Sequence, residues 1–381
     1  MIIVAPVQGP NSRDKHQNMT PDNPSPEPTY HQFAAADVSD DVLNQLNGLR
    51  LAKRAESHPG DPQPSAEELL RELRAPAIKG FNVEWTLGSL DSQPVGYAVW
   101  DLESLDNPQQ TWLDAFVLPD FRRQGLGGQL LSRALTGVEE RFKPTMAGFA
   151  VPAHTAVGSQ LIEHVEQAWG LKVGSVERMS RQILAESDLA AIEAELADRL
   201  ARQEGAYSFL FFAMDEFPPP ETGFSFESYL AACEEIFNLM PLEDIQVQPE
   251  RVTPESYLTR VARQRARGRL TWHYAVLDRA TQTCVGFTTI NFNPSDPRLL
   301  EQWGTGVVKA AQGHGLGKTL KLLMLVKILQ ELPRAQFIDT GNAHSNAPMI
   351  AINTALGFRE HFRLHVYQLE MARMRELVGG E

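Results

Sequence analysis

The fold is decided by the stretch Gln312-Gly313-His314-Gly315-Leu316-Gly317-Lys318, and a near copy occurs earlier as Arg122-Arg123-Gln124-Gly125-Leu126-Gly127-Gly128. Each copy follows a hydrophobic run suited to a β-strand, residues 112–118 and 303–308, and opens a segment with helical apolar spacing. Glycines let the backbone adopt positive φ angles and approach a ligand closely, while the free N–H groups at a helix start attract anions. The order strand, glycine turn, helix therefore predicts two phosphate-binding loops in one chain.

Spacing excludes two kinds of nucleotide site. A nucleoside-triphosphate loop requires Gly-x-x-x-x-Gly-Lys-Ser/Thr, and Gly317-Lys318-Thr319 supplies only its end, because the first glycine position is occupied by Gln312. A dinucleotide fingerprint, Gly-x-Gly-x-x-Gly, would need a glycine at Leu130 in the first copy and at Lys318 in the second. Neither kind of nucleotide loop fits the chain.

Both copies instead fit the pattern Arg/Gln-x-x-Gly-x-Gly, which resembles the pyrophosphate loop of the GNAT family of acetyl-coenzyme A-dependent N-acetyltransferases. The resemblance implies that acetyl-coenzyme A is the cofactor and that both loops hold phosphates. It also implies that the strand entering the second loop offers backbone N–H groups to the thioester carbonyl. The cofactor-binding residues expected on these grounds are Val307, Val308, Gln312, Gly313, His314, Gly315, Leu316, Gly317 and Lys318, together with Arg122, Arg123, Gln124, Gly125, Leu126, Gly127 and Gly128.

A second motif follows the later loop. Residues 342–358 resemble the GNAT pattern Asn-x-x-Ala-x-x-x-Tyr-x-x-x-Gly-Phe, with Asn346 as its leading residue. This resemblance adds Asn342 and Asn346 to the expected cofactor contacts. Two positions depart from the pattern: Met349 stands where alanine is usual, and Asn353 stands where many members place a tyrosine that is thought to reprotonate the leaving thiolate.

Acetyl transfer to an amine requires a base, because an alkylammonium has a pKa of about 10.4 and cannot attack while it is protonated. Glu301 lies eleven residues before Gln312, the spacing at which the histone-acetylating branch of the family places a glutamate. Strand alternation would put Glu301 on the same face as Trp303 and Thr305. It is the catalytic candidate for this step, although a solvated residue at a strand end would show the same spacing.

The proton donor for the thiolate is less well defined by the sequence. Asn353 cannot act as an acid, and no tyrosine replaces it locally. Ser345 and His344 are the nearest catalytic candidates, while His314, Tyr274 and solvent remain open.

Length and element order predict two units. A chain of 381 residues suits two domains of about 150–200 residues. The predicted fold class is α/β (α+β): two tandem GNAT acyltransferase domains, each a mostly antiparallel mixed sheet flanked by helices. We expect a flexible, proline-rich tail at residues 1–28, an N-terminal GNAT-like domain at 29–184 that closes with a hairpin ending at Leu184, and a catalytic C-terminal GNAT domain at 185–381.

The first unit is expected to be degenerate. Thr111 occupies the position that matches Glu301, and the asparagine motif is absent. Asp114 is a possible carboxylate, but its parity places it on the opposite face from Thr111. We therefore expect this unit to be structural, or to be a second coenzyme site with little or no catalysis.

Composition limits the partners and the compartment. The net charge of −13 offers no basic face for nucleic acid, and the hydrophobic and charged fractions, 43% and 22%, are ordinary for a globular protein. The only cysteines, Cys233 and Cys284, match no zinc motif, so no metal is expected. The longest apolar helix, near Leu320 to Leu329, is too short to span a bilayer, and no export signal is evident. These features predict a cytoplasmic protein with no membrane partner, as a monomer or homodimer.

Together these features predict an N-acetyltransferase that moves an acetyl group from acetyl-coenzyme A to a primary amine of a small molecule or peptide, by direct attack in a ternary complex. The alternative is a non-catalytic acyl-coenzyme A-binding or assembly protein, which the missing tyrosine and the degenerate first half would allow.

Overall fold

A computed structural model describes residues 27–76, 78–103 and 107–379. Of the expected N-terminal tail, residues 1–26 lie outside the described residues. The first half contains β1 (Thr29–Phe33), α1 (Asp40–Ser57), α2 (Ala66–Arg74), β2 (Phe81–Leu90), β3 (Gln93–Glu103), β4 (Gln110–Val117), α3 (Leu126–Arg141), β5 (Met146–Pro152), α4 (Ala156–Gln167) and β6 (Ser175–Ile183). The second half contains α5 (Leu189–Gln203), β7 (Tyr207–Ala213), α6 (Phe226–Asn238), α7 (Pro254–Ala266), β8 (Leu270–Asp278), β9 (Thr283–Asn293), β10 (Asp296–Val307), α8 (Leu316–Glu331), β11 (Phe337–Ala343), α9 (Ala347–Ala355), β12 (Arg359–Glu370) and α10 (Met371–Gly379).

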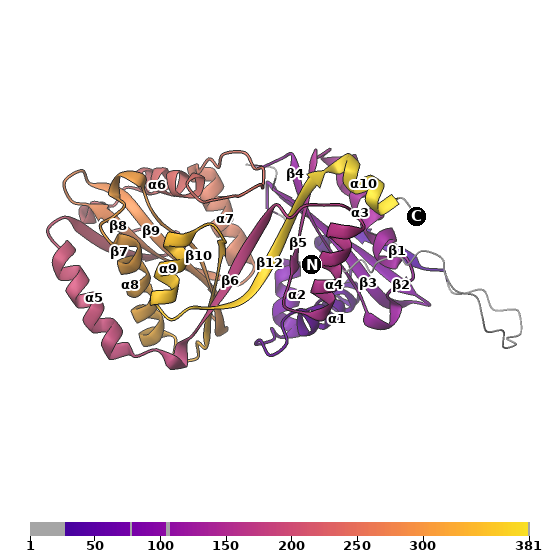
Figure 1. The fold of residues 1–381 in the computed structure, drawn as a ribbon, viewed down its shortest axis with the longest axis horizontal. Helices are drawn as coiled ribbons and strands as arrows, with labels where there is room; N and C mark the ends of the chain where they lie inside the picture. The colour runs from indigo at the N-terminus through magenta and orange to yellow at the C-terminus, as the bar shows by residue number, and fades with distance from the viewer. Residues whose placement is uncertain (1–26, 77, 104–106, 380–381) are drawn as a thin grey trace, which may run out of the picture.

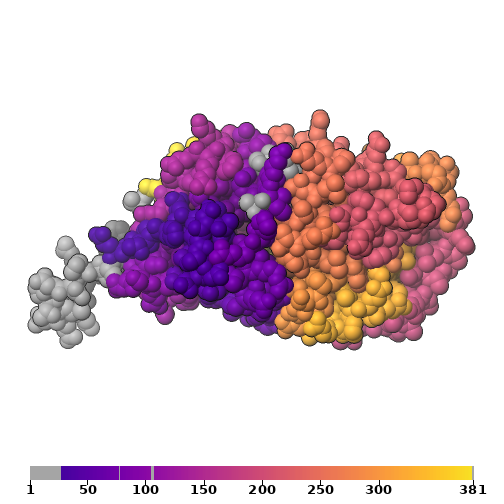
Figure 2. All heavy atoms as spheres, turned by 180° about the vertical axis from the view of Figure 1, so that it is seen from behind, coloured from indigo at the N-terminus to yellow at the C-terminus, as the bar shows by residue number. Residues whose placement is uncertain are grey.

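The predicted fold class is confirmed: the sheet is mostly antiparallel and mixed, and helices flank it in both halves. In the first half α3 packs on one face of the sheet and α1 on the other, and in the second half α8 and α6 take the corresponding places. Each half is therefore a helix–sheet–helix sandwich with an apolar core on both faces of its strands. Seen from behind, the two halves meet along a continuous boundary (Figure 2).

The two halves share one sheet because they exchange strands. Twelve strands run in the order β1-β2-β3-β4-β5-β12-β6-β11-β10-β9-β8-β7. Strand β12, from the end of the chain, lies between β5 and β6 and pairs antiparallel with both, while β6, from the first half, pairs with β11 of the second (Figure 1). The terminal helix α10 follows β12 across and packs on α3 (Figure 1).

The prediction that a hairpin closes the first half is wrong. Strand β6 forms at the expected place, but both of its neighbours come from the second half. The chain between α4 and β6 is too short and irregular to supply a partner strand, since Gly170 has a φ of 67° and the segment 170–174 contains no strand. The predicted boundary between Leu184 and Ala185 lies in the short 3-10 helix Leu184–Glu186 that follows β6.

Each half contains one place where neighbouring parallel strands separate. Strand β4 pairs with β5 only from Gln110 to Trp112, and β10 pairs with β11 only from Leu299 to Glu301. Beyond these points the two strands of each pair diverge toward the glycine loops, so each half has a V-shaped opening in its sheet. No described helix is long and apolar enough to cross a bilayer.

Candidate active site

The two glycine loops have the same backbone shape. In the second loop Gly313 and Gly315 have φ angles of 86° and 73°, and in the first loop Arg123 and Gly125 have φ angles of 66° and 76°. Gly315 and Gly125 are the N-caps of α8 and α3, and neither can cap its helix with a side chain. The first-turn N–H groups are thus left for another acceptor, as an anion-binding helix start requires.

The side chains around the loops differ. Gln312 donates from Nε2 to the Val307 carbonyl at 3.2 Å, and Arg122 donates from Nε to the matching Val117 carbonyl at 2.8 Å. The rest of the Arg122 guanidinium forms an ion pair with Glu56, at 3.0 and 2.5 Å. The first loop therefore holds its arginine in a protein ion pair, which leaves less of its charge for a phosphate.

Two cations beside the second loop, Lys318 of α8 and Arg199 of α5, share one carboxylate, Glu195, so this loop keeps a net positive charge nearby. The Lys318 ammonium lies 2.6 Å from Oε1 of Glu195, which also accepts from Nε of Arg199 at 2.8 Å. A Cβ added at Gly315 would meet Nη1 of Arg199 at 3.2 Å, so this arginine lies against the loop. At Gly313 the same test meets no heavy atom within 4 Å, so the space above the loop is open.

A cavity of about 520 Å³ lies where β10 and β11 diverge. We call it the strand cavity. It is lined by Trp112, Ser175, Glu177, Met179, Met240, Pro241, Leu242, Ile245, Val247, Gln302, Trp303, Gly304, Thr305, Lys321, Thr340, Gly341, Asn342, Ala343, Asn346, Met349 and Val366. The lining combines apolar side chains with a few polar groups, as small-molecule sites commonly do.

A buried polar network forms one wall of the strand cavity. The Lys321 ammonium donates to Oε1 of Gln302 at 2.8 Å and to Oδ1 of Asn353 at 2.6 Å. Asn353 in turn donates to Oδ1 of Asn342 at 2.7 Å, and Gln302 donates to Oγ1 of Thr288 at 3.0 Å. Burial lowers the pKa of Lys321 to about 7, because the charged form is desolvated.

A carboxylate lines the same cavity from the exchanged strand. Glu177 lies on β6, where it pairs with Ala343 of β11 and Leu364 of β12. Burial, together with the nearby negative charge of Glu243, raises the pKa of Glu177. The strand cavity therefore contains one carboxyl group with a raised pKa and one amine with a lowered pKa, and pKa values shifted in this way are typical of catalytic sites.

The predicted asparagines lie at this cavity, and the predicted acids do not. Asn342 and Asn346 both line it, and Asn346 also caps α9 by accepting from the Met349 N–H at 3.3 Å. Ser345 and His344 are exposed and are not among its lining residues. The Ser345 N–H donates to Glu243 at 3.2 Å, so this residue helps to hold the wall behind Glu177.

The strand entering the loop uses one of its predicted donors elsewhere. Val307 pairs with Gly286 of β9, and the Val308 N–H donates to the Val285 carbonyl at 2.9 Å. The expectation that the Val308 N–H is available to a thioester carbonyl is therefore wrong, because the sheet already takes this donor.

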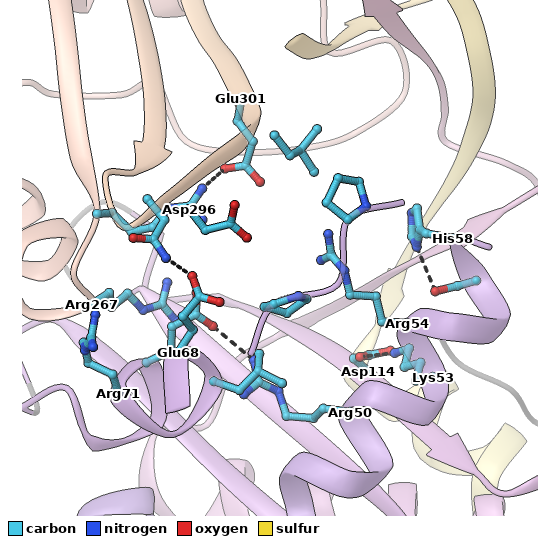
Figure 3. Close-up of a pocket in the computed structure, with 18 of the residues that line it drawn as sticks. Arg50, Lys53, Arg54, His58, Glu68, Arg71, Asp114, Arg267, Asp296 and Glu301 are labelled. Atoms are coloured by element: carbon cyan, nitrogen blue, oxygen red, sulfur yellow. Dashed lines mark hydrogen bonds and ion pairs between the residues drawn. The ribbon is translucent and has the colours of Figure 1, made fainter. Parts of the chain in front are cut away.

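Glu301 faces a different cavity. It lies 2.5 Å from Arg269 and lines a charged cavity of about 300 Å³ between the halves (Figure 3). We call this the interface cavity, and it is lined by Arg50, Lys53, Arg54, Ser57, His58, Pro62, Pro64, Glu68, Leu69, Arg71, Glu72, Tyr97, Asp114, Arg267, Arg269, Asn293, Asp296, Leu299 and Glu301. Asp114 lies here too, in an ion pair with Lys53 (Figure 3). Glu301 directly precedes Gln302 of the strand cavity, but its side chain points into a separate space.

The first unit lacks the polar wall. The loops align residue for residue, and the positions that match Gln302 and Lys321 are Trp112 and Leu131. Leu131 is fully buried in the first-half core, and the Trp112 ring lies so close to Gly148 that an added Cβ there would meet it at 2.7 Å. The equivalent opening in the first half thus carries apolar groups where the second half has an amine and an amide.

The residues of the second unit fit a coenzyme A molecule. The loop offers uncapped N–H groups and nearby cations to phosphates, and the strand cavity offers a lining of apolar side chains together with hydrogen-bonding groups. Among the described residues, no cluster of three or more histidine, cysteine, aspartate or glutamate side chains is arranged to hold a metal ion.

Comparisons with known proteins give the fold. No protein-family model matches the sequence, and neither does any curated protein. Among solved structures, a tandem GNAT protein from the clavulanic acid biosynthesis pathway is similar at a TM-score of 0.67 and 23% identity, over 91% of this chain and 99% of that one.

Two further structures agree. A GCN5-related N-acetyltransferase from Sphaerobacter thermophilus gives a TM-score of 0.59 at 16% identity, over 90% of this chain and 96% of its own. A structure described as a GCN5-related glucosamine N-acetyltransferase region of a fungal multi-domain β-N-acetylglucosaminidase gives 0.62 at 11% identity, over 90% of this chain and 38% of that one. The chain therefore has the tandem GNAT fold that the two loops predicted.

Proposed function

We propose that this chain, with its two tandem GNAT units, is an N-acetyltransferase that moves an acetyl group from acetyl-coenzyme A to a primary amine of a small molecule or peptide. The reaction would take place in the second unit, by direct attack in a ternary complex. The observation that carries the proposal is the strand cavity, which is lined by Thr305 of the strand that enters the uncapped glycine loop and contains an amine and a carboxyl group with shifted pKa values.

The chain's own residues would bind and orient the donor. The loop from Gln312 to Lys318 would hold the pyrophosphate through backbone N–H groups, with positive charge from Lys318 and Arg199 close by. Asn342 and Asn346 would line the channel for the pantetheine arm. When bound, acetyl-coenzyme A supplies an activated thioester.

Two carboxylates are candidates for taking the proton from the acceptor ammonium. Glu301 is favoured by its spacing from the loop, and Glu177 is favoured by its position in the strand cavity. A carboxylate with a raised pKa is a stronger base than an ordinary one, which supports Glu177.

The proposal is tested by thiol release from acetyl-coenzyme A across a panel of small amines and peptides, together with calorimetric titration of coenzyme A. Amine-dependent thiol release and one acetylated product are expected. Tight coenzyme A binding without turnover on any amine would instead favour the second candidate, a non-catalytic acyl-coenzyme A-binding or assembly protein. The asparagine at position 353 is the observation that keeps this candidate open.

We further propose that the first unit binds coenzyme A weakly or not at all, because Glu56 already neutralises Arg122. One strong coenzyme A site per chain is expected, and two catalytically competent sites of equal affinity would overturn this assignment. We propose a cytoplasmic monomer or homodimer; both cysteines are buried and unpaired, which is ordinary in a reducing compartment.

A further inference from the structure

Lys321 is a buried amine with no acidic partner. It lies on α8 and is only 3% exposed. Among the described residues no carboxylate forms an ion pair with it, and its two hydrogen-bond partners are the neutral amide oxygens of Gln302 and Asn353. A lysine placed only for stability would be costly here, since burying an amine disfavours its charged form.

The surrounding amides fix the direction of the Lys321 ammonium. The Gln302 and Asn353 side chains each donate from nitrogen to a further partner, so their oxygens are held toward Lys321. A protonated lysine has three donors, and these two oxygens occupy two of them. Because Lys321 lines the strand cavity, the third N–H is left for a group inside that cavity.

The charged groups around Lys321 are few. Glu177 of β6 lines the same strand cavity. On the neighbouring β11, Asp339 is already paired with Arg181 at 2.7 Å, and on α8 itself Lys318 is paired with Glu195. The Phe358 ring lies 5.2 Å from the ammonium and stabilises its charged form modestly.

Acetyl transfer leaves a thiolate that must take up a proton, and the position where many GNAT proteins have a tyrosine is Asn353 here. Asn353 cannot release a proton, but its oxygen accepts a hydrogen bond from Lys321. We propose that Lys321 is the catalytic acid of the second unit and that its Nζ–H, held by Gln302 and Asn353, protonates the departing coenzyme A thiolate. This inference rests on the proposed acetyl transfer.

The step balances. The acceptor nitrogen forms a bond to the acetyl carbon, the carbon–sulfur bond breaks, and its electron pair leaves with sulfur. The proton moves from Nζ to sulfur, so Lys321 becomes neutral and coenzyme A leaves as the thiol. The new amide nitrogen releases its second hydrogen to solvent as a proton, and solvent returns a proton to Nζ. Transfer is downhill, because a thiol of pKa about 8.5 holds a proton more tightly than an amine of pKa about 7.

A first test does not depend on turnover. Lysine Nζ and Cε resonances are followed through a pH titration, and Lys321 is assigned by comparison with Lys321→Met. We expect a midpoint near pH 7 that shifts when coenzyme A binds but not when desulfo-coenzyme A binds. A midpoint in the ordinary lysine range, or the same shift with both ligands, would show that Nζ does not meet the sulfur and would overturn the proposal.

A second test uses kinetics. Lys321→Met should lower kcat by roughly 10²- to 10⁴-fold with little change in KM, and it should abolish the fall in kcat above about pH 7 that loss of the ammonium causes. The matched control is Lys327→Met, which should retain kcat, because Lys327 lies on the same helix but is paired with Glu331 and does not line the strand cavity. An aryl thioester, whose leaving group needs no proton, should restore most of the loss. An unchanged kcat, or no restoration, would contradict the role.

The two proposals fail in different ways. If no amine is acetylated by the wild-type protein but the Lys321 titration responds to the sulfur of coenzyme A, the proposed function fails and the placement of Lys321 stands. If intact-mass measurements show a turning-over acetyl group on Lys321, the enzyme transfers acetyl groups through that amine, and its role as the acid is overturned.

Discussion

The buried amine of Lys321 affects stability as well as chemistry. In the unfolded chain its pKa returns to about 10.4, whereas in the folded protein it is about 7. Between these two pH values the unfolded chain binds more protons than the folded one. Stability should therefore rise with pH across this window, by up to about 1.4 kcal/mol per pH unit, and the penalty is fully present below pH 7.

Urea unfolding of wild type and Lys321→Met checks this effect. From pH 7 to pH 9 the wild-type free energy of unfolding should gain about 2 kcal/mol relative to the variant. Using the difference between the two proteins removes the other titrating groups that they share. Parallel stability curves would mean that the folded pKa of Lys321 is not lowered.

We expect opposite results from replacing Glu177 and Glu301 by glutamine. Glu177→Gln should lower kcat by about 10²-fold or more near neutral pH, because the base that lines the strand cavity is lost, while Glu301→Gln should change kcat little. Full pH–rate profiles of both variants are the measurement. The reverse result would return the role of base to Glu301. Glu177→Gln should fold normally, since it also removes repulsion from Glu243.

At the scale of single residues, the sequence indicated the backbone geometry of the glycine loops better than it indicated the residues that line the strand cavity. Loop geometry is local, so glycine spacing was enough to place the positive φ angles at Gly313 and Gly315. The sequence did contain a signal for Lys321. It is a lysine among the residues Leu320, Met324, Leu325 and Ile328, which form the buried face of the helix. Glu177 was not detectable, because its neighbours depend on which strands pair.

Strand β6 is the element on which both halves depend, and Arg181 ties it in place. Its guanidinium lies 2.7 Å from Asp339 of β11 and 2.5 Å from Asp61, which belongs to the segment between α1 and α2. Burial alone would raise the pKa of Asp61, but the hydrogen bond and charge of Arg181 outweigh it and lower that pKa. The side chain of Asp61 is only 5% exposed, so it needs this partner.

Replacing Arg181 should therefore lower the stability of the folded protein. Arg181→Met is expected to lower the free energy of unfolding by about 3–5 kcal/mol, because it leaves the buried carboxylate of Asp61 and the partly exposed carboxylate of Asp339 without their arginine. The control is Arg359→Met on β12, whose ion pair with Glu186 is exposed and contributes about 1 kcal/mol or less. Adding Asp61→Asn and Asp339→Asn should recover most of the loss in urea unfolding. Equal effects of the two arginine variants would argue against this account.

The sequence indicated where helices and strands form, but it did not indicate which strands pair with one another. The capping box of Ser65 and Glu68 at the start of α2 is an example of a local signal, because it is made by residues close together in the sequence. The strand that ends near Leu184 was also expected, but the sequence of a strand contains no information about its neighbours in the sheet. Helix α10 begins at Met371 directly after β12, with no loop between them to mark its start in the sequence.

At the scale of the whole molecule, the strand exchange joins two sandwiches into one structure. The interlock consists of β6 reaching into the second half and β12 with α10 reaching into the first (Figure 1). Neither half contains all the strands of its own sheet, so neither should be stable alone. The two glycine loops were enough to predict the tandem fold, but not that each half needs a strand from the other.

Cutting the chain at Ser187-Asp188 tests the dependence. Halves expressed separately should remain unfolded or associate with themselves, because β5 and β11 lack their neighbours. A protease site placed at the same position and cut after folding should leave the two pieces together in size-exclusion chromatography. Two separately folded monomeric halves, seen by circular dichroism, would contradict the interlock.

After a gene duplication, one copy can ordinarily accumulate substitutions once the other copy performs the reaction. Here the first half supplies the strand that carries Glu177 to the wall of the strand cavity, so it contributes to that cavity whether or not its own loop binds a ligand. Substitutions that erase its phosphate loop should be tolerated, while those that reshape β6 should be selected against. The two halves should therefore change together in evolution, because each depends on a strand from the other.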